Sequence, residues 1–197
     1  MTANPMRPHR AAILAGLAIT LVTLGVLFAM DRPPICTCGY VALWYGDINA
    51  SGNSQHLSDW YTPSHIIHGM LFYALGWLLF SRFGLGGKDA AKWSFTLAVF
   101  LEAAWEIIEN TPMVIDRYRS VTVNWGYSGD SIINSMADIG WMSLGFFLAL
   151  KLPVRVTVVL AIIMEVVAAL VVRDNLTLNV IMLIWPFEFI REWQALG

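Results

Sequence analysis

Residues 101–145 read LEAAWEIIENTPMVIDRYRSVTVNWGYSGDSIINSMADIGWMSLG, and the interpretation of the whole chain depends on this stretch. Five carboxylates and one amide lie in it at helical spacings: Glu102, Glu106, Glu109, Asp130, Asn134 and Asp138. The sequence on both sides is strongly apolar. Because an ionisable group in apolar surroundings is costly to bury, these carboxylates require either a functional or a structural explanation.

The composition is that of an integral membrane protein. Of 197 residues, 57% are hydrophobic and 13% are charged, and the mean hydropathy is +0.62. A soluble domain carries about 25% charged residues. The net charge of −2 argues against nucleic acid as a partner, because phosphate binding requires clustered basic charge. We therefore predict one membrane domain over residues 1–197, with the lipid bilayer as its partner. The sequence does not specify the oligomeric state.

Apolar segments along the chain predict an all-α integral membrane helical bundle of about six transmembrane segments. They cover residues 11–30, 64–80, 93–109, 131–150, 156–172 and 176–190, with outer loops at 31–62 and 110–130. The first segment has no A-x-A cleavage site after it, so we interpret it as a retained anchor rather than a signal peptide. The last segment is short and contains Pro186, so it either spans the bilayer or re-enters it.

The distribution of Lys and Arg predicts an inner-membrane protein with both termini in the cytoplasm. The cytoplasmic side would hold Arg7, Arg10, Arg82, Lys88, Lys92, Lys151, Arg155 and Arg191, and the outer side Arg32, Arg117, Arg119 and Arg173. This topology places the polar residues of four segments at one outer, periplasmic face: His65, His68, Glu106, Glu109, Asp130, Asn134, Asp138, Asn175 and Asn179.

The carboxylates are the first candidates for catalysis. Glu102, Glu106 and Glu109 are spaced by four and three residues, so they share one helix face, although the last two are also explained as interfacial groups that reach water. Asp130 follows a glycine and precedes a helix, which is typical of an N-cap. Capping does not explain Asp138, which should lie two turns into the helix. The predicted catalytic residues are His68, Glu102, Glu106, Asp130 and Asp138.

Two histidines open the second segment, which begins with the helix-start signal Thr62-Pro63. Histidines on one helix face together with carboxylates from other helices can build a metal site in a bundle. The predicted ligands of a divalent metal are His65, His68, Glu106 and Asp138. The alternative is one interfacial and one packed histidine, since no H-E-x-x-H signature is present.

The loop between the carboxylate-bearing helices predicts an anion-binding site. Arg117 and Arg119 precede the glycine turn 126–129, and arginine and the backbone N–H groups of such a turn both bind phosphate. With Asn134, they are the predicted substrate-binding residues. Equally, the arginines pair with Asp116 or with neighbouring carboxylates for structure alone.

Three further residues remain without a predicted role. Cys36 and Cys38 lie on the predicted outer side, where disulfides form, but a Cys-x-Cys bridge closes a very small ring, and we assign the pair no function. Glu165 stands alone in the fifth segment and should have a partner on another helix, which the sequence does not name.

The chain resembles a family of uncharacterised bacterial multi-pass inner-membrane proteins of unknown function. The segments that carry the resemblance are SDWYTPSHIIHG (58–69), WEIIEN (105–110) and GYSGDSIINSMAD (126–138). A more distant resemblance is to VanZ-like membrane proteins, through His68, Glu106, Arg119, Asp130 and Asn134 in this order. Ala137 replaces the final glycine of the VanZ-like pattern, and Asp138 is additional. This second resemblance implies a role in the cell envelope.

Three functions are compatible with these features. The first is a membrane-embedded hydrolase or transferase that acts on a phospholipid or isoprenoid phosphate at the outer leaflet. The second is a non-catalytic assembly subunit whose polar residues hold helices together. The third is a small proton-coupled transporter. The sequence shows no inverted repeat, which argues against this third function. The sequence does not identify a substrate.

Overall fold

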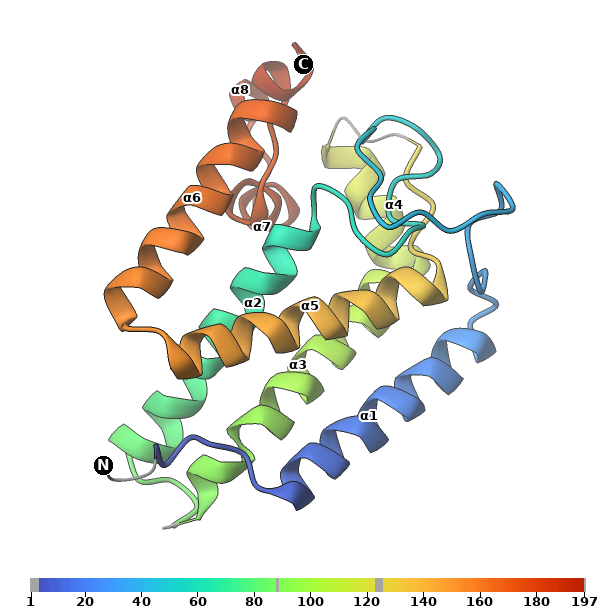
Figure 1. Ribbon diagram of the computed structural model, residues 1–197. Helices are drawn as coiled ribbons and strands as arrows, with labels where there is room; N and C mark the ends of the chain where they lie inside the picture. Colours follow the sequence, from blue (N-terminus) through green and yellow to red (C-terminus); the bar gives the residue numbers. More distant parts are fainter. Residues whose placement is uncertain (1–3, 88, 123–125, 197) are drawn as a thin grey trace.

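The computed structural model describes residues 4–87, 89–122 and 126–196, and over these residues the protein is entirely helical apart from its loops. Lys88, one of the basic residues used to predict orientation, lies outside this range. The elements are α1 (Arg10–Ala29), α2 (Thr62–Gly76) continued by a π-helical turn (Trp77–Arg82), a 3₁₀ turn (Ala90–Trp93), α3 (Ser94–Glu109), α4 (Pro112–Val121), α5 (Ile132–Lys151), α6 (Val154–Val172), α7 (Leu176–Ile184) and α8 (Glu188–Gln194) (Figure 1).

Helices α2, α3 and α5 form the centre of the bundle, with α1 against α3 and α6 against α2 (Figure 1). The core between them contains Phe95, Val99, Met142 and Phe146. The outward faces of α1 and α6 are apolar and exposed, with Leu170 76% accessible. Such faces suit lipid contact, so the helical membrane bundle predicted from the sequence is confirmed.

Within the described part of the chain, four helices are long and apolar enough to cross a membrane: α1, α2 with its π-helical extension, α5 and α6. Helix α3 has 16 residues and packs against α1, α2 and α5 at the centre of the bundle. Helix α7 has 9 residues, only ~13 Å at 1.5 Å per residue. Segment 176–190 is therefore divided between α7 and α8 and is not one continuous helix.

A close contact between two glycines brings α2 and α5 together. A Cβ atom on Gly69 would lie 1.9 Å from the carbonyl oxygen of Met142, and one on Gly145 would lie 1.9 Å from that of Ile66. Only hydrogen fits at either position, so the two backbones touch at this crossing. The histidines of α2 are thereby placed beside the polar face of α5.

The beginnings of the central helices follow local sequence signals. Pro63 occupies the first turn of α2, as predicted. Helix α5 begins one residue later than expected for an aspartate cap, because Ser131 is its N-cap and accepts a hydrogen bond from the backbone N–H of Asn134. Asp130 is therefore not a cap. Its carboxylate is buried and bonded to other side chains.

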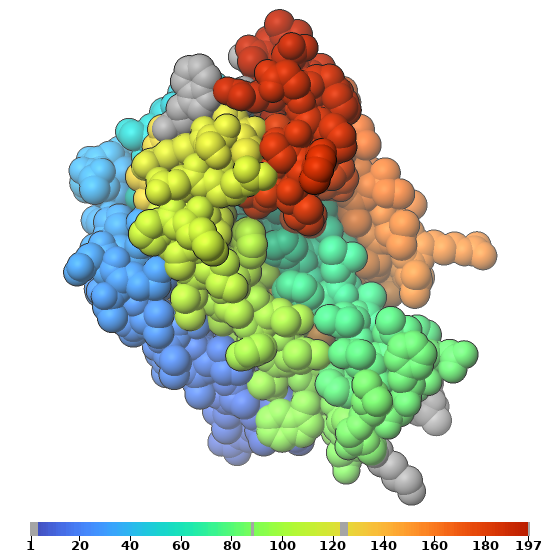
Figure 2. Space-filling view, turned by 180° about the vertical axis from the view of Figure 1, so that it is seen from behind, coloured from blue at the N-terminus to red at the C-terminus, as the bar shows by residue number. Residues whose placement is uncertain are grey.

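The predicted outer loop 110–130 contains a helix, α4, that starts at Pro112. Helices α4 and α7 pack against each other at the same end of the bundle as the loop 31–61, and Figure 2 shows the C-terminal segment (red) against α4 (yellow). Arg117 Nε donates to the carbonyl of Leu183 at 3.1 Å across this contact. The helix was missed because its composition is polar and its apolar face, which carries Ile115 and Tyr118, is short.

Candidate functional site

The polar ends of α2, α3 and α5 meet at one end of the bundle and enclose a cluster of buried ionisable side chains. Glu102 and Glu106 of α3 are each 0% exposed, Asp138 of α5 is 4% exposed and His65 of α2 is 7% exposed. Residues from separate helices are thus removed from solvent together. This convergence is the one expected from the alternating direction of the segments.

One carboxylate joins both histidines. Glu102 Oε1 lies 2.6 Å from His65 Nδ1, and Glu102 Oε2 lies 3.0 Å from His68 Nδ1. His65 and His68 are three residues apart on α2, so their rings project toward the same side of α3. Because Nδ1 of each ring faces Glu102, Nε2 of each ring is left free of that carboxylate, and for His65 it faces Asp138.

His65 also connects Glu102 to the two deeper carboxylates. Its Nε2 atom lies 3.7 Å from Asp138 Oδ2, and its Nδ1 atom lies 3.7 Å from Glu106 Oε1. Neither oxygen of Glu106 has a hydrogen-bond partner among the described residues, although both are fully buried. A buried carboxylate without partners is costly, so this position favours a bound cation or a proton on the cluster.

A second carboxylate centre lies beside the first. Asp130 Oδ1 accepts a hydrogen bond from the Tyr127 hydroxyl at 3.0 Å, and Asp130 Oδ2 accepts one from Asn110 Nδ2 at 3.0 Å. The Tyr127 hydroxyl lies 3.4 Å from Glu109 Oε1. Burial raises the pKa of Asp130 to about 6, although the Tyr127 and Asn110 hydrogen bonds oppose the shift.

A cavity of about 170 Å³ opens onto these groups. It is lined by residues of the loop before α2, of α2 to α5 and of α7: Ser54, Asp59, Tyr61, Ser64, His65, His68, Trp105, Glu109, Tyr118, Tyr127, Asp130, Asn134, Asp138, Leu176, Asn179, Val180 and Leu183. None of these lining residues is Lys or Arg. An anionic ligand in the cavity would therefore need a cation to balance its charge.

The outer wall of the cavity is a hydrogen-bonded network that the sequence did not indicate. The Tyr61 hydroxyl donates to Asp174 Oδ2 at 3.1 Å, and the Tyr118 hydroxyl bonds to Asn179. Burial raises the pKa of Asp174 to about 7 and also raises that of Asp59. One signal in the sequence could have indicated this network. Asp59 and Tyr61 come directly before Thr62-Pro63, which starts a helix, so both must lie near the end of that helix.

The predicted anion-binding arginines lie elsewhere. Arg119 Nε donates to the carbonyl of Tyr127 at 2.5 Å, and its Nη1 lies 3.7 Å from Asp116. Arg117 bonds to α7, as described above, and neither residue lines the cavity. Their placement matches the structural alternative. Asn134 does line the cavity, and its side chain donates to the carbonyl of His56 at 2.8 Å.

Glu165, whose partner was not predictable, accepts hydrogen bonds from the first backbone N–H groups of α7. Its two carboxylate oxygens lie 3.1 and 3.0 Å from the nitrogens of Leu176 and Thr177. A negative charge at a helix N-terminus is favourable, so Glu165 stabilises the α6–α7 turn and takes no part in the cluster.

Three overlapping sets of side chains in the cluster could hold a metal ion. In each set the ligand-type atoms all lie within 4.8 Å of one another: His65, His68 and Glu102; His65, Glu106 and Asp138; Glu106, Glu109 and Asp130. The second set has a further property. The Nδ1 atom of its histidine is bonded to a carboxylate outside the set, which is the usual orientation of a metal-ligating imidazole.

Comparison with known proteins places the chain among uncharacterised bacterial proteins. The family model described as a protein of unknown function (DUF2585) matches residues 27–196. A UPF0314 protein of Novosphingobium aromaticivorans is 50% identical over 190 residues, which is 96% of each chain. A UPF0314 protein of Rhizobium etli is 54% identical over 182 residues, covering 92% of this chain and 90% of the relative. No solved structure matches the chain.

The family model covers residues 27–196, a range within which all positions of the buried cluster lie. The matches do not show the more distant VanZ-like resemblance. The residues that suggested it are divided by the structure, since His68, Asp130 and Asn134 line the cavity and Arg119 does not. The chain therefore belongs to the DUF2585/UPF0314 family of uncharacterised bacterial proteins.

Proposed function

We propose that this protein is a membrane-embedded, divalent-metal-dependent hydrolase or transferase that acts on a phosphate ester of a lipid or isoprenoid. The observation that carries the proposal is the carboxylate of Glu106, which is 0% exposed and has no hydrogen-bond partner for either oxygen among the described residues. A fully buried charge is expected to be paired or to coordinate a metal.

The metal ligands in this proposal are Glu106 and Asp138 with His65 Nε2. One ligand-type atom of each of the three residues lies within 4.8 Å of the others, and His65 Nε2 lies 3.7 Å from Asp138 Oδ2. The three residues come from three different helices. Oxygen and imidazole ligands together suit Mn²⁺, Fe²⁺ or Zn²⁺. Glu102 is outside this set and holds the His65 ring in the orientation that directs Nε2 at the ion.

His68 is the proposed acid/base group. Its Nδ1 atom is bonded to Glu102, its side chain is 16% exposed, and the residue lines the cavity. A histidine held at Nδ1 by a carboxylate can accept or donate a proton at Nε2. Asp130 lies in the same cavity wall and completes the predicted catalytic set.

The substrate class follows from the charge and the position of the cavity. The lining residues are acidic and neutral, so a phosphate group gains its counter-charge from the metal and not from Arg117 or Arg119. The cavity lies at the ends of helices whose outer faces are apolar, which is where the head group of a membrane lipid lies. A lipid or isoprenoid phosphate meets both conditions.

The test uses the full-length protein purified in detergent. Metal content is measured after passage over a chelating resin and reloading with Mn²⁺ or Zn²⁺, and phosphate release is measured from phosphatidic acid and from an isoprenyl phosphate in mixed micelles. We expect bound metal and metal-dependent phosphate release in the wild type and neither in Glu106→Gln. Glu188→Gln, at an exposed position on α8, is the matched control and should behave as wild type.

Two results would separate the alternatives. If the wild type retains no metal and releases no phosphate, the proposal fails, and the cluster is a structural assembly site of the kind that holds helices together. If the wild type binds metal without releasing phosphate from either substrate, the metal site stands and the reaction is withdrawn.

A further inference from the structure

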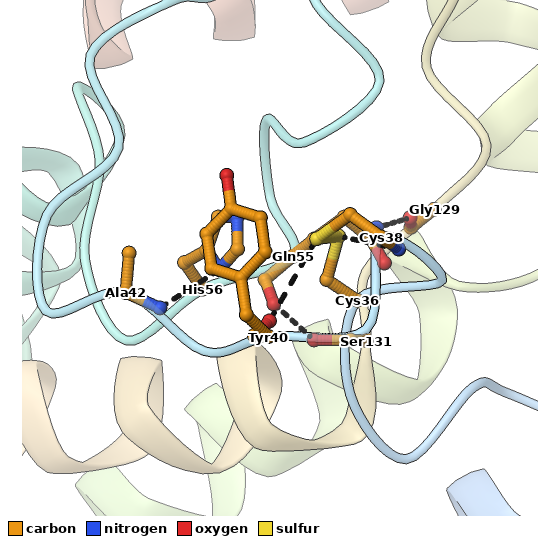
Figure 3. Close-up of a disulfide and its surroundings, with 8 residues drawn as sticks. All are labelled: Cys36, Cys38, Tyr40, Ala42, Gln55, His56, Gly129 and Ser131. Carbon is orange, nitrogen blue, oxygen red and sulfur yellow. Dashed lines mark hydrogen bonds between the residues drawn. A yellow bond between two sulfur atoms is a disulfide. The ribbon is translucent and has the colours of Figure 1, made fainter.

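A disulfide lies in the loop that precedes α2. Cys36 and Cys38 are joined, with one residue between them, and the two residues differ in exposure. Cys36 is 3% exposed, whereas Cys38 is exposed to solvent. Figure 3 shows the bridge next to the ring of Tyr40 and above the start of α5. An incoming thiol can therefore reach one sulfur and not the other.

Each sulfur has a neighbour that suits the reduced state. The backbone N–H of Cys38 donates to Cys36 Sγ at 3.1 Å, and such a donor stabilises a thiolate on that sulfur. Cys38 Sγ lies 3.7 Å from the main-chain oxygen of Tyr40. A sulfur in a disulfide carries no hydrogen, so it cannot donate a hydrogen bond to this oxygen. Once reduced, the Cys38 thiol can donate a hydrogen bond there without a change of position.

A buried histidine lies beside the pair. His56 is 1% exposed and stacks between Tyr40 and Tyr45, at ring-centroid distances of 5.0 and 4.8 Å. Its Nδ1 atom accepts from the backbone N–H of Ala42, so the neutral ring carries its hydrogen on Nε2. That Nε2 atom has no partner among the described residues. One donor atom from each of Cys36, Cys38 and His56 lies within 4.8 Å of the others.

The bridge adds little to the stability of the loop. A disulfide stabilises a fold chiefly by closing a long loop, and this one spans a single residue. Other contacts hold the segment: the backbone N–H groups of Ile132 and Ile133 donate to the carbonyls of Pro33 and Pro34 at 2.8 and 3.1 Å. The position of the loop is therefore maintained when the bridge opens.

From these contacts we propose that Cys36–Cys38 is a thiol–disulfide exchange site that oxidises a dithiol, with Cys38 as the sulfur attacked. The thiolate of the substrate bonds to Cys38 Sγ, the Cys36–Cys38 bond breaks, and its electron pair leaves on Cys36. The second thiol of the substrate, as thiolate, then attacks the substrate sulfur of the mixed disulfide. The substrate leaves as a disulfide, and Cys36 and Cys38 remain as a dithiol with the two protons of the substrate.

Reoxidation requires a second disulfide. A low-molecular-weight disulfide such as oxidised glutathione runs the same two steps in reverse and restores the bridge. The loop that carries the bridge lies at the same end of the bundle as α4 (Figure 1), and residues of this loop and of α4 line the cavity. The positive-inside rule assigns this end to the outer side. An outer location is oxidising, as such a site needs.

The test uses the full-length protein in detergent and maps mixed disulfides by mass spectrometry after acid quenching. Wild type treated with reduced glutathione should open its bridge while folded and should carry glutathione on Cys38 only. Cys36→Ser treated with oxidised glutathione should gain one glutathione at Cys38. Cys38→Ser should react at least about ten-fold more slowly, because Cys36 is buried.

Each opposite result would overturn the proposal. A bridge that survives reduced glutathione in the folded protein and opens only after denaturation is a static crosslink. Equal capture of glutathione by Cys36 and Cys38 would contradict the assigned direction of attack. The wild-type measurement stands even if a cysteine variant fails to fold. Glu106→Gln should exchange at the wild-type rate, so failure of the metal-dependent reaction and failure of the exchange site are separable.

Discussion

Glu102 Oε1 of α3 lies 2.6 Å from Nδ1 of His65 on α2, at a place where both residues are buried. The same carboxylate reaches His68 with its other oxygen at 3.0 Å. One acidic side chain therefore sets the ring orientation of two histidines, and Nε2 of each ring is directed away from it. The geometry of the cluster depends on this relationship more than on any other pair.

Glu102→Gln tests this dependence. An amide has one acceptor oxygen and one NH₂ group, so it cannot offer a separate acceptor oxygen to each imidazole as the carboxylate does. Changes to the group that orients a ligating histidine cost about 10–100-fold in metal affinity. We expect a loss in this range for Mn²⁺ or Zn²⁺, measured by equilibrium dialysis of the purified protein. Glu188→Gln is the control, and unchanged affinity in Glu102→Gln would contradict the assigned role.

Asp138→Asn distinguishes a ligand from a helix-packing residue. The change keeps the size of the side chain and removes a buried charge, so the thermal stability of the metal-free protein should stay level or rise. Metal retention should nevertheless be lost, because an amide binds a divalent cation more weakly than a carboxylate does. Both quantities are measured on one preparation. A variant that retains metal as wild type does would remove Asp138 from the ligand set.

Gly145→Ala should destabilise the protein strongly. The added Cβ would lie 1.9 Å from the carbonyl oxygen of Ile66, so α2 and α5 would have to separate. Overpacking of this kind costs about 1–3 kcal/mol or more. Gly140→Ala, on the same helix with no atom within 4 Å of the added Cβ, is the matched control. Thermal unfolding in detergent compares the two, and equal midpoints would contradict the close crossing.

Asp174 predicts how stability depends on pH. Its pKa is about 7 in the folded protein against the ordinary aspartate value of 3.8, so between these values the folded state binds more protons than the unfolded state. Stability should therefore fall as pH rises from about 4.5 to about 8. Asp130, with a pKa of about 6, acts in the same direction. The fall should be smaller in Asp174→Asn, and an identical fall in variant and wild type would refute the assignment.

Reporter fusions test the orientation. Fusions after Arg82 and after Lys151 should be active as cytoplasmic reporters, and a fusion after Arg119 should be active as a periplasmic one, because of the bias of basic residues. The first two positions end α2 and α5 at one end of the bundle, and the third lies in α4 at the other. A periplasmic signal from the Lys151 fusion would reverse the side assigned to the cavity.

The sequence predicted the helical fold class and the polar residues that come together at one end of the bundle, because both depend on local patterns. Apolar runs identify spans, and alternation of their direction brings the end of α3 and the start of α5 to one side. Glu106 and Asp138 accordingly lie in one cluster with His65. Spacing within a helix also indicated that Glu102 and Glu106 share a face.

Other features depend on contacts between distant segments that no spacing encodes. Asp130 resembled a cap, but Tyr127 and Asn110 bind its carboxylate and Ser131 caps the helix. Arg119 resembled a phosphate ligand, but it bonds to the carbonyl of Tyr127. Helix α4 was predicted as part of a loop, because it is short and polar and gains stability from packing against α7.

The start of α5 donates hydrogen bonds to residues that lie much earlier in the chain. Its first backbone N–H groups donate to the carbonyls of Pro33 and Pro34, and Ser131 Oγ donates to the carbonyl of Gln55. The loop that follows α1 thus fixes the residue at which α5 begins, and through it the depth at which Asp138 lies in the bundle.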